Sequence, residues 1–339
     1  MTTRKDVAHL ARVSEATVSR VFSDHPSVKP ETKRRVLQAA QELGYAPHAL
    51  ARAVARKRSQ NIGVVLPYLP DRPLFSYDYV ADILNGIALT VRNRGYDLVL
   101  FQRPIHEHGT LQRFFDSKKI DGAIFLGLTQ YDHQALLDLQ SAEQYFVMIG
   151  YRSPELMHLA INADHFKGSF QAVAHLIAQG HRRIALINGE RYYSDSTLRE
   201  EGVRAACSAY DFMDCTVYHG SYDQRWGAEF VDIYLALSPR PTAVLAANDL
   251  IAFGFMQALK SRGIRPGLDV AIVGYDDSHI AELLDPPLSS VRVPHFEMGL
   301  RAAEELINNI ERGTVGHAAL PPVDVELVVR ASSAYRFEQ

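Results

Sequence analysis

The sequence predicts an α/β protein with a three-helix N-terminal head that contains a helix-turn-helix, a hinge helix, and a larger body built on parallel sheets. Residues 6–22 have the pattern of two short helices joined by a tight turn. Residues 1–58 carry 12 Lys and Arg against 5 Asp and Glu, a net charge of +7, whereas the remaining residues carry 24 against 34, a net charge of −10. From residue 59 onward, short apolar runs alternate with amphipathic helical stretches, which is typical of parallel sheets covered on both faces.

The helix-turn-helix is predicted from small apolar residues on facing sides of its two helices, at Val7, Ala8, Ala11, Val18 and Val21. Small alanines allow two helices to cross closely. Ser14 is suited to cap the second helix, whose outward face carries residues able to meet base edges and phosphates. The expected DNA contacts of this helix are Ser14, Glu15, Ala16, Thr17, Ser19 and Arg20. The alternative, a helical hairpin without a nucleic-acid partner, does not account for the basic charge of the head.

A third helix is predicted from Pro30 to about Leu43, because Pro suits a first helical turn and Gly44 suits a helix end. Its expected buried face contains Val36, Leu37, Ala40 and Leu43. The hinge segment at 47–57 favours a helix by composition, but an isolated helix of this length is marginal in water. We therefore expect a hinge that folds only against DNA and a partner copy. The alternative is an ordered linker helix packed on the body.

The body is predicted to alternate strands and helices. The expected strands are Ile62–Leu66, Tyr96–Phe101, Ala123–Leu126, Phe146–Ile149, Arg183–Ile187, Val244–Ala246 and Ala271–Gly274, with helices near 80–94, 111–118, 166–178, 198–209, 224–237 and 249–262. Ligands of such sheets bind beyond the carboxyl ends of the strands. Those ends carry aromatic, amide, carboxylate and guanidinium groups, which suit a sugar. Loop capping is the alternative for each polar residue, above all for Asn248 and Asp249 before a helix.

Several function classes lack their sequence signatures. The chain has no GxSxG, P-loop or HExxH motif, and His106 and His108 have no further metal ligands near them, so no enzyme activity, metal site or cofactor is expected. No apolar segment follows Met1 and no run of 18 apolar residues occurs, which argues against a periplasmic or membrane protein. Having only two cysteines, Cys207 and Cys215, fits a reducing cytoplasm and no disulfide framework.

Six segments together resemble the LacI/GalR family of bacterial transcription regulators over essentially the whole chain. They are DVAHLARVSEATVSRVF (6–22), VKPETKRRVLQAAQELGYAPHALARAVA (28–55), GHRRIALING (180–189), TAVLAANDLIAFGFMQAL (242–259), VAIVGYDDS (270–278) and PPLSSVRVP (286–294). The resemblance implies a DNA-binding unit at 1–58, with the helix-turn-helix head at 3–45 and the hinge helix at 47–57. It also implies a body at 59–339 like periplasmic sugar-binding proteins. One subdomain would comprise about 60–160 and 292–321, and the other about 161–291 and 322–339. The chain would cross between the two subdomains three times, and the effector would bind between the subdomains.

The resemblance sharpens the expected DNA contacts. Glu15 and Ala16 match the two positions that vary most with operator sequence. In the hinge, His48, Ala51 and Val54 are expected to contact DNA, and Val54 stands where the family usually has a leucine that wedges into the minor groove. Arg12 occupies a turn position where many helix-turn-helix sequences have Gly, so we expect positive φ there at a cost of about 1 kcal/mol.

The resemblance also implies an effector site. The expected contacts are Phe75, Tyr79, Arg152, Arg199, Tyr222, Asn248 and Asp276. Asp276 would bind effector hydroxyls, and Tyr222 would pack on the ligand. Val80 replaces the second of two aromatics commonly found after Tyr79, and Phe75 or Tyr77 is the expected compensation. Gly150 replaces an acidic residue of some family members, and Arg152 is the nearest polar substitute.

These features predict a cytoplasmic, nucleoid-associated repressor of carbohydrate-utilisation genes, controlled by a small sugar. A nucleobase or nucleoside effector or corepressor is the alternative, since Asp276 could hold a ribose and Tyr79 could stack on a purine. No residue speaks for a phosphocarrier protein as co-effector. The hinge predicts a homodimer on a pseudo-palindromic operator. A tetramer is not expected, because the chain runs only to Gln339 after the predicted last strand Val323–Val329 and leaves no room for a coiled coil.

Overall fold

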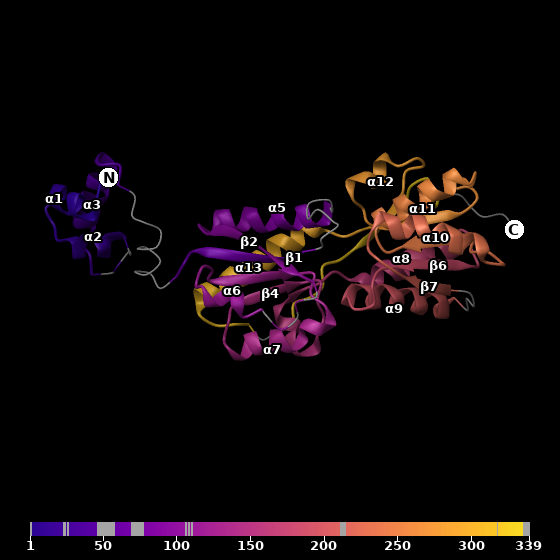
Figure 1. Ribbon diagram of the computed structural model, residues 1–339, viewed down its shortest axis with the longest axis horizontal. Helices are drawn as coiled ribbons and strands as arrows, with labels where there is room; N and C mark the ends of the chain where they lie inside the picture. The colour runs from indigo at the N-terminus through magenta and orange to yellow at the C-terminus, as the bar shows by residue number, and fades with distance from the viewer. Residues whose placement is uncertain are drawn as a thin grey trace.

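The structure is a computed structural model in which a helical head lies at one end of an elongated body that contains two sheets (Figure 1). It describes residues 2–22, 25, 27–45, 58–68, 78–105, 107, 109, 111–210, 215–316 and 318–334. The expected hinge helix at 47–57, with His48, Ala51 and Val54, lies outside these residues, and so do Phe75 and Tyr77.

The head consists of three helices, α1 (Arg4–Leu10), α2 (Glu15–Phe22) and α3 (Pro30–Glu42). Their common core is small and aliphatic: Val7, Ala8, Ala11, Val18, Val21, Val36, Ala39 and Ala40. Arg12 has φ +52°, the positive value expected at the turn. The expected buried face of α3 was wrong at Leu37, which is 44% exposed, because Ala39 and Ala40 already complete the stripe that begins at Val36.

The first sheet of the body has the strand order β2-β1-β3-β4-β5 and is parallel throughout. Its strands are β1 (Asn61–Tyr68), β2 (Asp97–Pro104), β3 (Gly122–Leu126), β4 (Phe146–Ile149) and β5 (Ala160–Ile161). The helices associated with it are α5 (Asp78–Asn93), α6 (Arg113–Asp116), α7 (His133–Ser141) and α13 (His295–Arg312), with 3₁₀ turns at Gln130–Asp132 and Pro154–Leu159. Separate hydrophobic clusters cover the two faces of the sheet, so its strands are buried on both sides.

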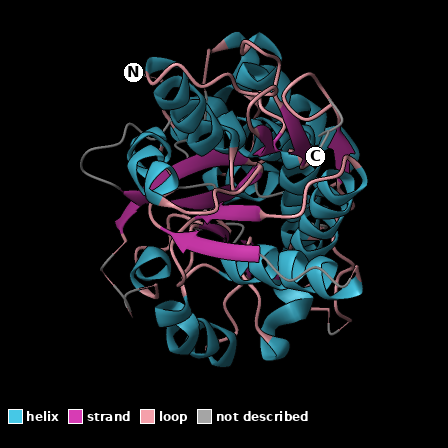
Figure 2. Cartoon of the chain, turned by 90° about the vertical axis from the view of Figure 1, so that its right-hand side faces the viewer, coloured by secondary structure: helices cyan, strands magenta, loops and turns pink. Residues whose placement is uncertain are grey.

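The second sheet has the strand order β11-β10-β9-β8-β6-β7, in which only β10 and β11 pair antiparallel. Its strands are β6 (Ile184–Asn188), β7 (Cys215–His219), β8 (Ala243–Ala246), β9 (Ala271–Asp276), β10 (Ser289–Arg292) and β11 (Glu326–Val328). The helices packed around it are α8 (His165–Ala178), α9 (Ser194–Ala209), α10 (Gln224–Ala236), α11 (Asp249–Ser261) and α12 (His279–Leu283). Viewed from its far end, this part of the body shows helices around the strands (Figure 2).

The chain passes between the two sheets three times. It leaves the first sheet after β5, returns to it from β10 into α13, and leaves it again before β11. The first and third crossings run side by side, since Ala163 and Val323 form an isolated parallel bridge. The ends of strands from both sheets therefore face one another across these connections.

Helices α5 and α13 cross at very short range because each has a glycine at the contact. A Cβ atom at Gly86 would collide with the carbonyl oxygen of Phe296, and one at Gly299 would collide with that of Ile83. The close backbone contact fixes the starts of both helices, where Tyr79 and His295 lie.

The body contains every strand and helix expected in it, with bounds that differ by a few residues, and it has further elements that were not expected, notably β7, β10, α7 and α13. The last strand is shorter than expected, Glu326–Val328. The structure joins the two cysteines, Cys207 and Cys215, in a single disulfide that was not expected; their Cα atoms lie 6.7 Å apart, between the end of α9 and the start of β7. No helix among the described residues combines the length and apolar character needed to span a membrane.

Candidate functional site

A cavity of about 310 Å³ lies between the two sheets, at the carboxyl ends of their strands. The side that belongs to the first sheet and its helices is largely apolar: Val80, Ile83, Ile105, Leu126, Ile149 and Met298. The side that belongs to the second sheet is largely polar or aromatic: His165, Tyr193, Asp195, Arg199, Tyr222, Asn248 and Asp276. The cavity therefore has one apolar wall and one hydrogen-bonding wall.

Arg199 on α9 lies on the polar wall and is held by aromatic side chains. Its Nη1 donates to the hydroxyl of Tyr222 at 2.9 Å, and its guanidinium carbon lies 4.4 Å from the centre of the Tyr275 ring. The same Tyr222 hydroxyl is 2.6 Å from Ser196 Oγ, which fixes the ring. The buried Nε of Arg199 has no hydrogen-bond partner among the described residues. An unpaired buried N–H of a cation is costly, so the position of Arg199 is maintained by its other contacts.

The Asp195 carboxylate faces the cavity from the first turn of α9. Asp195 Oδ2 lies 3.3 Å from His165 Nε2, and the other ring nitrogen of His165 lies 3.3 Å from the hydroxyl of Tyr275. Burial opposes ionisation of Asp195, but His165 and the Arg199 guanidinium outweigh it and hold the pKa of Asp195 below its ordinary value. The polar wall thus carries a carboxylate and a guanidinium side by side.

Asp276 ends β9 with φ +98°, and Asp277 follows with φ +52°. Such values are rare for residues other than glycine, and backbone strain of this kind clusters at ligand sites. Asp276 Oδ1 lies 3.3 Å from Nε2 of His295, the first residue of α13. This contact joins the second sheet to a helix of the first.

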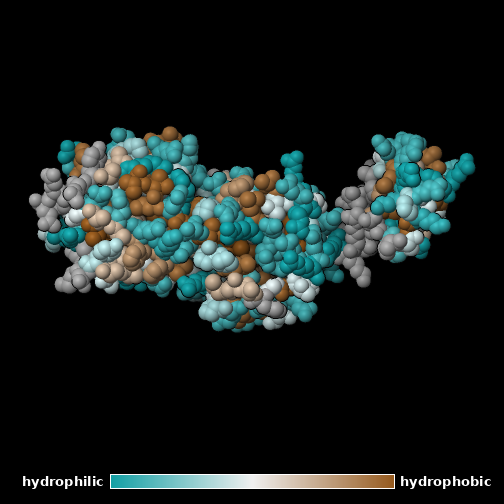
Figure 3. Space-filling view, turned by 180° about the vertical axis from the view of Figure 1, so that it is seen from behind, coloured by the Kyte–Doolittle hydropathy of each residue, from teal (hydrophilic) through white to brown (hydrophobic). Residues whose placement is uncertain are grey.

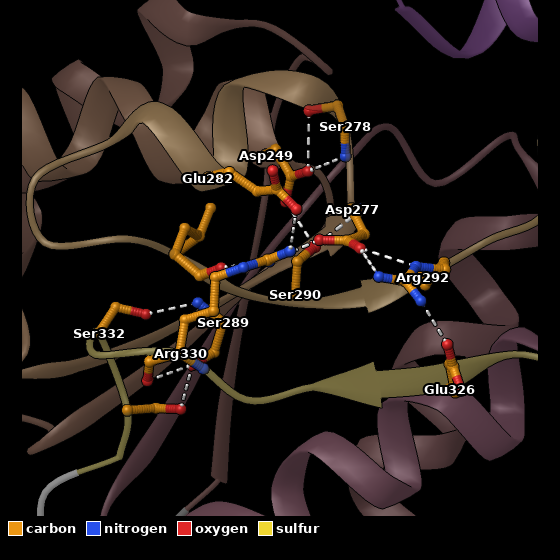
Figure 4. Close-up of polar contacts among 12 residues, drawn as sticks. Asp249, Asp277, Ser278, Glu282, Ser289, Ser290, Arg292, Glu326, Arg330 and Ser332 are labelled. Atoms are coloured by element: carbon orange, nitrogen blue, oxygen red, sulfur yellow. Dashed lines mark hydrogen bonds and ion pairs between the residues drawn. The ribbon is translucent and has the colours of Figure 1, made fainter.

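The strained turn is held by the polar network drawn in Figure 4. Asp277 accepts from Arg292 Nε at 2.8 Å and from Arg330 Nη1 at 2.6 Å. Asp249 accepts from the backbone N–H of Ser278 at 2.7 Å and from Ser290 Oγ at 2.6 Å. Because these groups hold the residues on both sides, the Asp276 carboxylate is left to face the cavity.

Five of the expected effector contacts line the cavity: Tyr79, Arg199, Tyr222, Asn248 and Asp276. For Asn248 both interpretations describe the structure, because Oδ1 accepts from the Ile251 N–H at 2.8 Å as a helix cap while the residue also faces the cavity. Val80 lines the apolar wall.

Arg152 does not reach the cavity, which corrects the expectation that it replaces an acidic residue there. Gly150 turns the chain at φ +74°, Tyr151 then points into the core, and Arg152 points to solvent. Its backbone N–H donates to Ser194 Oγ at 3.1 Å. Asp195 occupies the space that a side chain at Gly150 would enter, since its Oδ2 would lie 3.3 Å from a Cβ there.

The cavity is also lined by four residues that were not expected there: His165, Tyr193, Asp195 and His295. A signal was present for His165, His295 and Asp195, because each is the first or second residue of a helix that follows a strand or a crossing. That position places a side chain at the carboxyl end of a parallel sheet.

The expected DNA-contacting residues of the head lie on and before α2. Ser14, Glu15, Ala16 and Arg20 are exposed, and Thr17 and Ser19 are half-buried. Ser14 Oγ also accepts from the Thr17 N–H at 3.1 Å, as a helix cap does. The structure adds an ion pair that was not expected, between Arg4 Nε and Glu15 Oε2 at 3.1 Å. A base contact by Glu15 would have to compete with this pair.

Two family models match the chain. Residues 3–48 match the model of bacterial regulatory proteins of the lacI family, and residues 173–333 match that of the periplasmic binding protein-like domain. These matches fall on the helix-turn-helix head and on the part of the body that holds most of the polar wall.

The chain is also similar to individual proteins over nearly its whole length. It is 33% identical over 336 residues to the HTH-type transcriptional repressor CytR of Escherichia coli K12, which covers 98% of this chain and 96% of that protein. A structure of the transcriptional regulator CelR in complex with cellobiose matches with a TM-score of 0.75 and 31% identity, over 98% of this chain and 100% of that one. The lac repressor dimer bound to operator and the anti-inducer ONPF matches with a TM-score of 0.82 and 26% identity, over 98% and 99%.

Proposed function

The chain belongs to the LacI family of DNA-binding transcriptional regulators, and from that premise we propose that it is a repressor whose affinity for its operator is controlled by a small sugar in the cavity between the two sheets. Residues 1–58 bind the operator through α2 and the hinge. Residues 59–339 bind the effector and pair two copies into a homodimer, which places two heads on the halves of a pseudo-palindrome.

The main support for a sugar as the effector is that the cavity has one apolar wall and one polar wall. A sugar ring has an apolar face and a rim of hydroxyl groups. Tyr79 and Tyr222 offer rings for the face, while the Asp276 carboxylate and the Arg199 guanidinium offer an acceptor and a donor for hydroxyls. The CelR complex, in which a relative of this fold holds cellobiose, supports the same ligand class.

A nucleoside is the second candidate, and one contact favours it. The rings of Tyr79 and His295 lie 5.6 Å apart, next to the Asp276 carboxylate. A base stacked on these rings would bring its ribose hydroxyls to Asp276. The aromatic pair thus suits either a base or the apolar face of a sugar.

In the proposed mechanism the ligand lies between the two sheets and contacts side chains from both. Tyr79 and His295 move with the first sheet, whereas Arg199 and Asp276 move with the second. An effector that contacts all four side chains can bind one arrangement of the two sheets more tightly than another. The difference between these affinities shifts the population toward the tighter-binding arrangement and so changes the preferred angle between the sheets. That angle sets whether the two hinges of the dimer meet over the minor groove.

A thermal-shift screen of sugars and nucleosides, followed by operator retardation with each hit, tests this proposal. We expect a sugar to raise the melting temperature and to change the operator affinity of the full chain. Hits confined to nucleosides would replace the sugar by the second candidate. A hit that leaves operator affinity unchanged would contradict control through this cavity.

A further inference from the structure

We propose that the effector is a neutral two-ring saccharide, whose second ring occupies a separate chamber between α5, α11 and α12. This inference rests on the proposed function and extends it from a ligand class to a ligand size.

The second chamber also measures about 310 Å³. It is lined from the start of α5, from the start of α11 and from α12, and it shares Tyr79, Asn248 and Asp276 with the first cavity. These three side chains form the boundary between the two spaces, so a ring on either side of it contacts the same carboxylate.

The lining of the second chamber matches a sugar ring. Leu250, Ile280 and Leu283 provide aliphatic surface for an apolar ring face, and Ser278 provides a hydroxyl group. Leu283 is 70% exposed, the largest exposure among the described large hydrophobic side chains. A ring laid on it would remove this apolar surface from water.

The chamber favours an uncharged ring. Among the described residues that line it, three carry carboxyl groups, Asp78, Asp249 and Asp276, and none is a lysine or an arginine. An acidic or phosphorylated second ring would meet the negative charges of Asp78 and Asp276 there, at a cost that grows in a partly buried site. A neutral sugar instead offers hydroxyl donors to the same groups.

The opposite side of the first cavity is closed by a contact between the two halves of the body. The backbone N–H of Gln130 donates to the carbonyl oxygen of Tyr192 at 3.1 Å, and the rings of Tyr131 and Tyr192 lie 6.4 Å apart. Tyr192 follows β6, whereas the second chamber lies beyond β8 and β9, on the other side of the cavity. The described structure therefore leaves room for ligand extension toward α12.

The experiment compares monosaccharides with disaccharides built from them, in the full chain, by calorimetry. The probes are glucose with cellobiose and maltose, and galactose with lactose. The variants are Leu283→Ala and Leu283→Asp. The matched control is Leu268→Asp, because Leu268 is also exposed but lies just before the first residue of β9, at the end of the strand away from the chamber. We expect one disaccharide to bind at least about tenfold more tightly than its monosaccharide, a gain that both Leu283 variants reduce and the control keeps.

The outcomes separate this inference from the function on which it rests. Equal affinity for a monosaccharide and its disaccharides, or an equal loss for both in the Leu283 variants, overturns the second chamber and leaves a sugar effector standing. Absence of binding to every saccharide, together with binding of a nucleoside, overturns the sugar effector and the disaccharide with it. A gain that survives Leu283→Asp places the second ring elsewhere and overturns the chamber.

Discussion

At the scale of single residues, Asp276 and Asp277 are neighbours of one type whose surroundings separate their roles. Asp277 lies between Arg292 and Arg330, with 4% of its side chain exposed. Asp276 contacts His295 and lines both chambers. The sequence motif contains both residues, but only the contacts distinguish the carboxylate that holds the turn from the one that faces the ligand.

Replacing Asp276 by Asn should weaken effector binding by about 1–3 kcal/mol, the scale of a lost charged hydrogen bond. The amide keeps the shape of the side chain, so we expect operator affinity without effector to change much less. Calorimetry with the sugar found by the thermal-shift screen measures the effect. Asp285→Asn is a matched control, because the side chain of Asp285 is 94% exposed. Unchanged effector affinity in Asp276→Asn would remove Asp276 from the site.

The buried carboxyl of Asp249 should make stability fall as the pH rises. Burial, reinforced by the charge of Asp276, raises the pKa of Asp249 to about 8, above its value of 3.8 in an unfolded chain. Between these two values the folded protein holds a proton that the unfolded chain has lost, so the free energy of unfolding decreases as the pH increases from about 4 to 8. Below about pH 4 the Asp249 carboxyl is protonated in both the folded and the unfolded chain and does not change the free energy of unfolding. Above about pH 8 it is ionised in both, and the full cost of burying its charge lowers the free energy of unfolding.

Melting temperatures at a series of pH values from about 5 to 8 test this assignment for Asp249. We expect Asp249→Asn to have a flatter dependence than the unchanged chain, because an amide has no proton to lose. Asp285→Asn should keep the original slope. Parallel curves for the unchanged chain and for Asp249→Asn would show that Asp249 is already ionised in the folded protein.

Residue motifs predicted the part of the site that lies at the ends of recognisable strands. Asn248 and Asp276 were found in this way, since each directly follows or ends a buried apolar run. Asp195 and His165 each lie at the start of a helix, which was a usable signal, but the contact between them joins two helices and is visible only in the folded chain. Arg152 was misplaced because the direction of a side chain after a glycine turn depends on a backbone angle that the sequence does not display.

At the scale of elements, most strands with a continuous apolar run were predicted, whereas β7 and β10, in which polar residues interrupt the run, were not. β10 begins with Ser289 and Ser290, which are fully buried; their hydroxyl groups donate to the carbonyl oxygen of Arg330 and to Asp249 Oδ1. β7 is an edge strand and only half-buried. α13 has a strong apolar stripe, yet its position on the first sheet follows from a crossing that no local pattern shows.

Substituting Gly86 by Ala should destabilise the body even though Ala is the better helix former. The added methyl group would collide with the backbone of α13 at Phe296 and Leu300, so α5 and α13 must separate. Overpacking of this kind costs about 1–3 kcal/mol, and separation should also weaken effector binding because Tyr79 and His295 begin these helices. Thermal melting and calorimetry measure the two effects.

Gly316→Ala is the control for the α5–α13 contact. Its nearest heavy atom would be Glu305 Oε1 at 3.7 Å, an ordinary contact, so the same substitution should leave melting temperature and effector affinity unchanged. A Gly86→Ala variant as stable as this control would show that the two helices have room to spare.

At the scale of the whole molecule, charge divides the chain into two functional parts. The overall net charge is only −3, but residues 1–58 carry +7 and the remainder carries −10. In Figure 3 the head presents a mainly hydrophilic surface, whereas hydrophobic residues form larger patches on the body. A polyanion is therefore attracted by one part and repelled by the other, so we expect residues 1–58 to bind DNA and the rest of the chain not to.

Removal of residues 1–58 should abolish operator binding and leave effector binding intact. The head has its own core of small aliphatic residues, and both sheets of the body lie outside it, so the truncated chain keeps every strand of the effector site. In the full chain, phosphate contacts by the basic head should make operator affinity fall by about a hundredfold or more between about 50 mM and 200 mM salt. Retardation assays at several salt concentrations measure this slope, and calorimetry with the identified effector verifies that the truncated body is folded. If that body still retarded operator DNA, the acidic part of the chain would hold a DNA site that its net charge of −10 argues against.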